Sequence, residues 1–340
     1  MRPLIAIVGA GRIGSLRASI LVEEGFPVIA IDPRPPCNAG LETVPNIGEV
    51  QTLPAAWIIA TPTSTHLRVL TQIMRRDPTA AVLVEKPACT PEQLTRLREL
   101  LLLHRHCAIE FASQYCDSAA VRALVEETQP GADVVISFVK DRRREEEMGR
   151  FRDSVSGVLG YEWPHLYSIA RALGVLHSDL NPVDPDKSML SVIDDDGYLV
   201  EARWETTGAD GRRVVLHSGI NGAESHLLDT CAPDPSNYRL VQTNNTDGRT
   251  STLWLAPSRL ARDRRPRARN SLLVCDSSGR RRLRTIAHDP LRSSMLAALE
   301  RLIEGCPREN QSGLEAVEHI TLLLNLRSRA VQGSSRHATA

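Results

Sequence analysis

The eight residues from Ile7 to Gly14 are IVGAGRIG, a G-x-G-x-x-G pattern built on Gly9, Gly11 and Gly14. The pattern follows a short apolar run and precedes a stretch with apolar residues at helical spacing, so it joins a predicted strand to a predicted helix. In this position the first glycine permits a tight turn, the second lets a pyrophosphate approach the backbone, and the third lets helix and strand pack closely. The stretch therefore predicts a dinucleotide-binding turn, although a purely structural turn would show the same letters.

An acidic residue at the end of the second predicted strand strengthens this interpretation. Asp32 follows the apolar run 28–31, where a carboxylate can accept hydrogen bonds from both ribose hydroxyls and repel a 2′-phosphate. It favours NAD over NADP as the cofactor. Arg34 counts against that preference, because a nearby guanidinium could hold a 2′-phosphate. Arg12 and Ile13 open the helix whose N-terminal amides would face the phosphates.

The rest of the first third of the chain alternates strands with helices. Short apolar runs predict buried parallel strands, and the segments between them show the spacing of amphipathic helices. The predicted strands are 4–8, 28–31, 57–60, 81–84 and 108–111, and the predicted helices are 12–24, 65–76 and a stretch that begins at Thr90. This α/β alternation predicts a Rossmann fold, a doubly wound parallel sheet, which we place in a domain of residues 1–120.

The pattern changes after about residue 130. A strand is predicted over 134–139 and a helix over 162–173, and the stretch 188–286 consists of strand-like runs separated by turn signals. Residues 121–330 are therefore predicted to form an α+β domain with a large, open, mainly antiparallel sheet. The last residues, 331–340, are predicted to be a disordered tail.

The composition excludes several classes of partner. The formal net charge is zero, which predicts no strong attraction to nucleic acid or to a membrane surface. There is no apolar segment of the roughly 18 residues that a membrane span requires, and no signal peptide is expected. The seven cysteines form no CxxC pair, which predicts reduced thiols in a cytoplasmic protein without a metal site.

The motif ATPTSTH occupies residues 60–66, directly after a predicted strand. Pro62 ends the strand, and the hydroxyl groups can cap the next helix, so a capped turn alone would explain the motif. In a doubly wound sheet, however, the carboxyl ends of the strands form the ligand crevice. We therefore assign cofactor contacts to Thr61, Thr63 and His66.

The tripeptide Glu85-Lys86-Pro87 stands at the carboxyl end of a later predicted strand. Only three of the 41 Lys and Arg residues are lysines, so a lysine at this position is unusual in a chain whose basic residues are almost all arginines. A compact ammonium can stabilise a forming alkoxide and can exchange protons when burial lowers its pKa, whereas arginine keeps its charge. A surface lysine after a strand is the alternative interpretation.

In this order and spacing, GAGRIG at 9–14, ATPTSTH at 60–66 and EKP at 85–87 resemble the Gfo/Idh/MocA family of sugar and cyclitol dehydrogenases. That family includes glucose–fructose oxidoreductase and inositol dehydrogenase, and the resemblance covers essentially the whole chain. It implies a second domain that binds the substrate and mediates oligomerisation, in a homodimer or homotetramer. It also implies that Glu85 and Lys86 lie at the nicotinamide, and that the Lys86–Pro87 bond is often cis.

The resemblance further points to a catalytic histidine within residues 160–174, GYEWPHLYSIARALG. His165 matches the family's histidine, and a histidine can take a hydroxyl proton near neutral pH. Alone, a histidine among apolar neighbours would be interpreted as a packed core or surface residue. Many family members carry an aspartate one helical turn earlier, where this chain has Tyr161. Glu162, its neighbour, would point about 100° away around a helix.

The charged segment 140–157 joins the first strand of the second domain to this helix. In the family such a segment lies over the substrate, although a solvated loop would show the same composition. If the segment faces the site, its carboxylates would suit an amino-sugar cation and its arginines a phosphate. We assign substrate contacts to Lys86, Asp153, Tyr161, Glu162 and His165.

We therefore predict an NAD-dependent dehydrogenase that oxidises a ring hydroxyl to a ketone, with His165 as base, Lys86 assisting and Tyr161 able to relay a proton. The substrate would be a cyclitol, a sugar or an amino sugar, including aminoglycosides and nucleotide sugars, which would fit a role in antibiotic biosynthesis. Two alternatives stay open. The same fold could reduce another carbonyl, an imine or a tetrapyrrole, or the chain could be a non-catalytic, NAD-binding transcriptional co-regulator.

Overall fold

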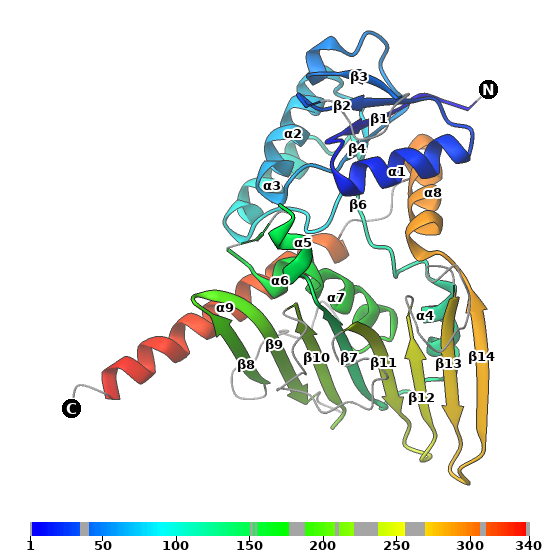
Figure 1. Cartoon of the computed structure of the whole chain (residues 1–340), viewed down its shortest axis with the longest axis vertical. Helices are drawn as coiled ribbons and strands as arrows, with labels where there is room; N and C mark the ends of the chain where they lie inside the picture. The colour runs from blue at the N-terminus through cyan, green and yellow to red at the C-terminus, as the bar shows by residue number, and fades with distance from the viewer. Residues whose placement is uncertain are drawn as a thin grey trace. The chain divides into compact units, whose positions relative to one another are not determined.

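The computed structural model describes residues 2–34, 41–149, 152–153, 155–176, 188–207, 211–220, 237–255, 269–306 and 311–337. The chain divides into two compact units (Figure 1). The first unit comprises Met1–Ser113 and Leu291–Val317, and the second comprises Gln114–Pro290 and Glu318–Ala340. The division at Ser113 lies slightly before the predicted boundary at residue 120, and the return of Leu291–Val317 to the first unit was not predicted.

The first unit holds a six-stranded parallel sheet in the order β3-β2-β1-β4-β5-β6. Its strands are β1 (Ile5–Val8), β2 (Val28–Ile31), β3 (Glu42–Val44), β4 (Ala56–Ile59), β5 (Ala81–Val84) and β6 (Ala108–Phe111). The strand order reverses direction between β1 and β4, as in a doubly wound sheet. The predicted fold class is confirmed for this unit, and β3 is a strand that the sequence pattern missed.

Helices cover both faces of this sheet. They are α1 (Arg12–Glu23), η1 (Ile47–Glu49), α2 (Thr63–Arg76), η2 (Pro91–Gln93), α3 (Leu94–Leu103) and α8 (Pro290–Ile303). Alternate residues of the strands enter two separate cores, because successive side chains of a strand point to opposite faces. One core joins the sheet to α2 and α3, and the other joins it to α1 and α8.

The last helix, α9 (Gln311–His337), begins in the first unit and continues into the second. Val317 belongs to the core that holds α2 and α3. The prediction of a disordered tail from residue 331 differs from the structure, in which 331–337 continue this helix and 338–340 lie outside the described residues. Each residue added to a helix that already exists gains a backbone hydrogen bond, so the helix extends beyond its apolar part.

The second unit holds an eight-stranded sheet in the order β14-β13-β12-β11-β7-β10-β9-β8. Its strands are β7 (Asp133–Lys140), β8 (Ser188–Asp195), β9 (Tyr198–Thr207), β10 (Arg213–Gly219), β11 (Asn237–Asn244), β12 (Thr250–Trp254), β13 (Arg269–Cys275) and β14 (Arg281–Ala287). All pairs of neighbours are antiparallel except β7 with β10, which are parallel. The predicted open, mainly antiparallel sheet is confirmed.

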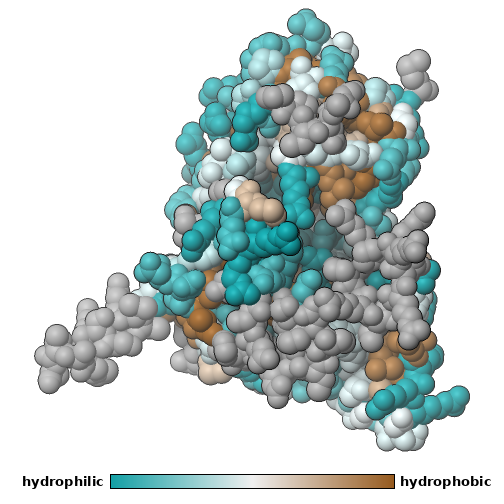
Figure 2. Space-filling model, viewed as in Figure 1, coloured by the Kyte–Doolittle hydropathy of each residue, from teal (hydrophilic) through white to brown (hydrophobic). Residues whose placement is uncertain are grey.

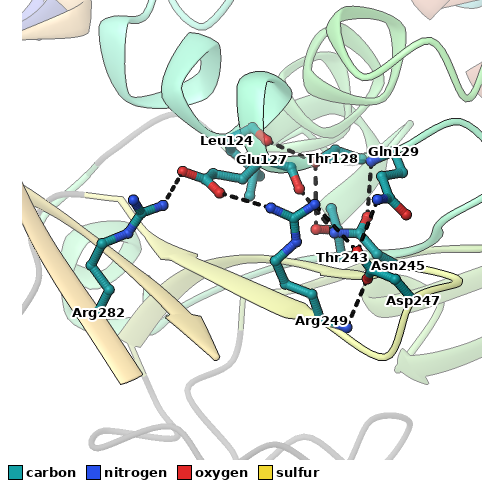
Figure 3. A network of polar contacts seen from close by, with 9 residues as sticks. All are labelled: Leu124, Glu127, Thr128, Gln129, Thr243, Asn245, Asp247, Arg249 and Arg282. Carbon is teal, nitrogen blue, oxygen red and sulfur yellow. Dashed lines mark hydrogen bonds and ion pairs between the residues drawn. The ribbon is translucent and has the colours of Figure 1, made fainter. Parts of the chain in front are cut away.

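Four helices precede the hairpins of this sheet in the chain: α4 (Ala119–Glu127), α5 (Arg143–Glu147), α6 (Val158–Tyr161) and α7 (Trp163–Ala172). A polar network ties the end of α4 to the β11–β12 hairpin (Figure 3). Asn245 accepts a hydrogen bond from the Gln129 amide at 2.9 Å and donates one to the Glu127 carbonyl at 2.9 Å. Arg249 and Arg282 both reach the Glu127 carboxylate.

Within the described part of the chain, no helix is both long and apolar enough to span a membrane. On the face drawn in Figure 2, hydrophilic side chains cover much of the described surface, with smaller hydrophobic areas between them.

Candidate functional site

The glycine-rich turn between β1 and α1 has the geometry that a pyrophosphate needs. Gly9 adopts φ +96°, and a β-carbon there would lie 2.8 Å from the Thr61 amide nitrogen. A β-carbon on Gly14 would lie 1.8 Å from the Gly9 carbonyl oxygen, so only glycine lets the helix approach the turn. A β-carbon on Gly11 would meet no atom within 4 Å, which leaves open space in front of the backbone. The turn therefore fits a dinucleotide's phosphates.

Asp32 lies at the same edge of the sheet and is held by two backbone amides. Ala10 N–H donates to its Oδ2 at 2.8 Å, and Arg34 N–H donates to its Oδ1 at 2.9 Å. The Arg34 side chain is 87% exposed, with Nε 3.8 Å from Asp32 Oδ1. Arg12 and Ile13 are exposed in the first turn of α1. The carboxylate is thus fixed next to the glycine-rich turn, where a ribose would be recognised.

The turn after β4 carries the next predicted residues. Thr61 is partly exposed and its hydroxyl accepts a hydrogen bond from Thr65 at 2.8 Å, and Thr63 opens α2. His66 is placed differently from the prediction, because it is buried with both ring nitrogens on backbone carbonyls, Thr61 O at 2.8 Å and Pro87 O at 3.0 Å. Burial lowers the pKa of His66, although the carbonyl contacts oppose the shift. His66 therefore ties two turns together rather than presenting a nitrogen to a cofactor.

Glu85 lies directly after β5, and its contact with the nicotinamide stays a prediction. It is buried, and its carboxylate is paired with the buried Arg17 of α1 and accepts the Lys86 amide N–H at 3.2 Å. Burial raises the pKa of the Glu85 carboxyl, but the charges of Arg17 and Lys86 outweigh that effect and hold the pKa below its ordinary value. The pair therefore joins the EKP segment to the helix of the glycine-rich turn.

Lys86 follows β5 and is half-buried. The Lys86–Pro87 peptide bond is cis, as the resemblance implied. Because β1, β2, β4 and β5 are parallel, the glycine-rich turn, Asp32, Thr61 and Lys86 all stand at the carboxyl edge of one sheet.

In the second unit, His165 lies in the first turn of α7 and is only 6% exposed. The Tyr115 ring meets it edge to face, with ring centroids 5.2 Å apart. The pKa of Tyr115 is raised by burial, and the nearby Arg239 opposes that shift. Sequence analysis missed Tyr115 and Arg239, because neither stands in a motif. The fold brings Tyr115 to His165 and Arg239 to Tyr115 and Glu162.

Glu162 lies between two helical segments, because α6 ends at Tyr161 and α7 begins at Trp163. Glu162 is 5% exposed, and its Oε2 lies 3.7 Å from an Arg239 nitrogen. The acidic side chain therefore belongs to the buried cluster that also contains Tyr115 and Arg239.

Tyr161 and Asp153 contact each other. The Tyr161 hydroxyl accepts a hydrogen bond from the Asp153 amide at 2.6 Å. Asp153 Oδ1 accepts from the amides of Val155 at 3.2 Å and Ser156 at 2.9 Å, so its carboxylate stabilises the turn before α6. The Tyr161 ring lies under the Arg142 guanidinium.

An aromatic cluster packs around Trp163 and Tyr167 of α7. Trp163 Nε1–H donates to His319 Nδ1 of α9 at 3.0 Å. The His319 ring stacks on Trp163 and meets Trp204 edge to face at 4.7 Å between centroids. His319 is fully buried. Among the described residues, no group of three or more His, Cys, Asp or Glu side chains is placed to hold a metal ion.

Comparison with known proteins agrees with this fold. Residues 4–106 match the model of an oxidoreductase family with an NAD-binding Rossmann fold. No curated protein matches the sequence.

Several solved structures are similar over nearly the whole chain. A UDP-N-acetylglucosamine 3-dehydrogenase from Acidithiobacillus ferrooxidans is 16% identical with a TM-score of 0.67, covering 94% of this chain and 96% of that chain. The WlbA dehydrogenase from Thermus thermophilus, in complex with NAD and UDP-GlcNAcA, is 17% identical with a TM-score of 0.62, covering 95% and 94%. A 3-ketoreductase from Actinomadura kijaniata, in complex with NADP and TDP-benzene, is 13% identical with a TM-score of 0.68, covering 94% and 96%. At these identities the likeness concerns the fold.

Proposed function

Because the chain belongs through its residues 4–106 to the Gfo/Idh/MocA oxidoreductase family, we propose that it is an NAD-dependent dehydrogenase of a sugar, amino sugar or cyclitol. The observation that carries the proposal is the carboxyl edge of the parallel sheet. There the open glycine-rich turn, the fixed Asp32 carboxylate and Lys86 stand together. The names of the similar structures support a nucleotide sugar as the substrate.

The proposal gives each residue a chemical task. The turn Gly9–Gly14 binds the pyrophosphate, Asp32 binds the ribose, and Thr61 and Thr63 border the cofactor. A bound NAD supplies the acceptor for the hydride that leaves the ring carbon. His165 takes the hydroxyl proton, and the Lys86 ammonium stabilises the alkoxide as the proton departs. Two electrons and one proton leave with the hydride, and the second proton goes to His165, so the oxidation balances.

NAD is the proposed cofactor, because the Asp32 carboxylate would repel a 2′-phosphate. Its position between two amides keeps that charge at the ribose site. The exposed Arg34 would favour NADP, and the similar structures include one complex with each cofactor.

The reverse reaction is a second candidate, favoured by the likeness to a 3-ketoreductase. In that direction His165 would give its proton to the ketone oxygen as the hydride arrives, and Lys86 would polarise the same oxygen. Equilibrium measurements from both sides would decide the preferred direction. A co-regulator without catalysis would show no turnover in either direction.

A substitution series at Lys86 tests the proposal, with NADH absorbance followed over a panel of sugars, nucleotide sugars, aminoglycosides and cyclitols. Lys86→Ala should lower turnover by roughly 10²–10⁴, the contribution of a positioned acid–base group, and leave NAD affinity within a few-fold. Lys86→Arg should not restore turnover, because the guanidinium is broad and keeps its proton. The exposed Arg68→Ala on α2 is the control and should change neither. Near-normal turnover in Lys86→Arg would show that Lys86 supplies only a positive charge and would contradict its role in proton transfer.

A further inference from the structure

Arg142 is a buried cation in the second unit. It follows β7, and its backbone N–H donates to the Ile220 carbonyl at 2.9 Å, which fixes the segment beside the end of β10. The residue is only 2% exposed. Its guanidinium carbon lies 3.5 Å from the centroid of the Tyr161 ring, so the cation rests on an aromatic face.

The polar contacts of this guanidinium are incomplete. Its Nε is buried without a hydrogen-bond partner. Within the described ranges no carboxylate forms an ion pair with Arg142, and the acidic residues that follow it have other contacts. Glu145 pairs with Lys140 at 3.0 Å, and Glu146 accepts a hydrogen bond from the Tyr198 hydroxyl at 3.0 Å.

Other buried or half-buried arginines show what Arg142 lacks. Arg17 is paired with Glu85, Arg301 donates to both oxygens of Glu110 at 2.9 and 2.8 Å, and Arg239 lies 3.7 Å from Glu162. Burial removes the hydration of a charge, and an opposite charge normally replaces it. The Tyr161 ring supplies only part of that compensation. Arg142 therefore has the properties of a cation whose anion is a ligand.

We propose that Arg142 binds an oxyanion of the substrate, either a phosphate of a nucleotide sugar or the carboxylate of a sugar acid. The inference rests on the proposed function and names the substrate class within it. A guanidinium can donate two parallel hydrogen bonds to either group. The position of Arg142 suits a substrate contact, because Arg142 rests on the ring of Tyr161, the last residue of α6. Only Glu162 separates α6 from α7, the helix that contains His165.

Isothermal titration calorimetry on the full-length, NAD-saturated protein tests this binding without turnover. The probes are UDP-N-acetylglucosamine for phosphate, glucuronate for carboxylate, and N-acetylglucosamine as the uncharged reference. Arg142→Gln removes the charge, and Arg143→Gln is the matched control because Arg143 is exposed and paired with Asp141. We expect wild type and Arg143→Gln to bind at least one anionic probe equally. Arg142→Gln should bind that probe at least tenfold more weakly, with its affinity for N-acetylglucosamine unchanged within twofold.

A thermal-shift measurement separates a ligand role from a structural one. Without an anionic probe, Arg142→Gln should melt at or above the wild-type temperature, because it lacks an uncompensated buried charge. The anionic probe that binds through Arg142, UDP-N-acetylglucosamine or glucuronate, should raise the melting temperature of the wild type more than that of Arg142→Gln. Which of the two does so tells whether the bound group is a phosphate or a carboxylate.

Three outcomes would overturn the inference: equal affinity of Arg142→Gln and wild type for both anionic probes, no binding of either probe to the wild type, or a variant that melts lower and loses NAD binding. A wild type that binds the anion through Arg142 but oxidises no sugar would instead refute the proposed function and leave the oxyanion site standing. The two failures are therefore distinguishable.

Discussion

The buried side chain of His319 should make the free energy of unfolding depend on pH. Burial lowers the pKa of His319 to about 3, from an ordinary value of 6.5. Below pH 6.5 the unfolded chain binds a proton at this position that the folded chain does not bind. The free energy of unfolding should therefore fall as the pH drops from about 6.5 toward 3, by at most ~1.4 kcal/mol per pH unit.

The variant His319→Gln, which cannot titrate, tests this dependence. Between pH 7 and pH 5, the wild type should lose roughly 2 kcal/mol more unfolding free energy than the variant. Urea unfolding followed by tryptophan fluorescence measures the difference, since Trp163 and Trp204 surround this histidine. The exposed His106→Gln serves as the control and should keep the wild-type slope. Parallel slopes for wild type and His319→Gln would show that the buried histidine does not carry the effect.

Asp32 and Arg34 favour different cofactors, NAD in the case of Asp32 and NADP in the case of Arg34. The wild type should bind NAD more tightly than NADP, because the fixed carboxylate repels the added phosphate. Asp32→Ser should weaken NAD binding about tenfold, which is roughly the contribution of one good hydrogen bond to a charged group. The variant should also show a smaller preference for NAD over NADP. Arg34→Ala should weaken only NADP. Dinucleotide titrations by fluorescence measure the affinities of all three proteins for both cofactors, and tighter NADP binding by the wild type would contradict the assignment.

At the scale of elements, Asn245 holds a hairpin to a helix end (Figure 3). Asn245→Ala would leave the Gln129 amide and the Glu127 carbonyl without their partner in a partly buried place, which should cost about 1–3 kcal/mol of unfolding free energy. Thr246→Ala, next to it and exposed, should change the value by less than about 0.5 kcal/mol. Chemical denaturation of the two variants checks the pair. Equal free energies of unfolding for Asn245→Ala and Thr246→Ala would show that the hydrogen bonds of Asn245 do not stabilise the fold.

The elements that sequence analysis predicted are those whose signals are local. β1, β2 and β5 are short apolar runs, and the helical stretch predicted to begin at Thr90 opens with a capping box of Thr90 and Gln93. β3 was missed because Glu42–Val44 is short and mostly polar, with no apolar run to mark it. The break at Glu162 was missed because the same residues fit one helix as well as two.

The candidate site divides in the same way. The glycine-rich turn and Asp32 follow β1 and β2 as the sequence pattern predicts, since the carboxyl end of each strand is readable from the chain, and their cofactor contacts stay a prediction. Tyr115 and Arg239 come from distant segments, and only the folded sheet brings them to His165 and Glu162. The inward turn of Glu85 toward Arg17 likewise depends on how α1 lies against β5, which no spacing in the sequence reports.

At the scale of the whole molecule, we predict a homodimer or homotetramer. One face of a mainly antiparallel sheet can be solvated or can pack against a second subunit, and the resemblance to the sugar dehydrogenases implies the second arrangement. Met189 on β8 and Leu283 on β14 are 53% and 63% exposed in the single chain. Light scattering at micromolar concentration measures the assembly, and a monomeric mass would contradict the prediction.

The return of Leu291–Val317 to the first unit has a consequence for synthesis on the ribosome. Met295, Leu299 and Leu302 of α8 fill one face of the nucleotide-binding sheet, against Ile5 and its neighbours. That face stays uncovered while the ribosome makes residues 114–290, so the parallel sheet is completed long after its strands have been made. Competence to bind a dinucleotide then arrives only once residues 291–317 have been made, and a nascent chain stalled before residue 291 would carry an uncovered apolar surface that attracts chaperones.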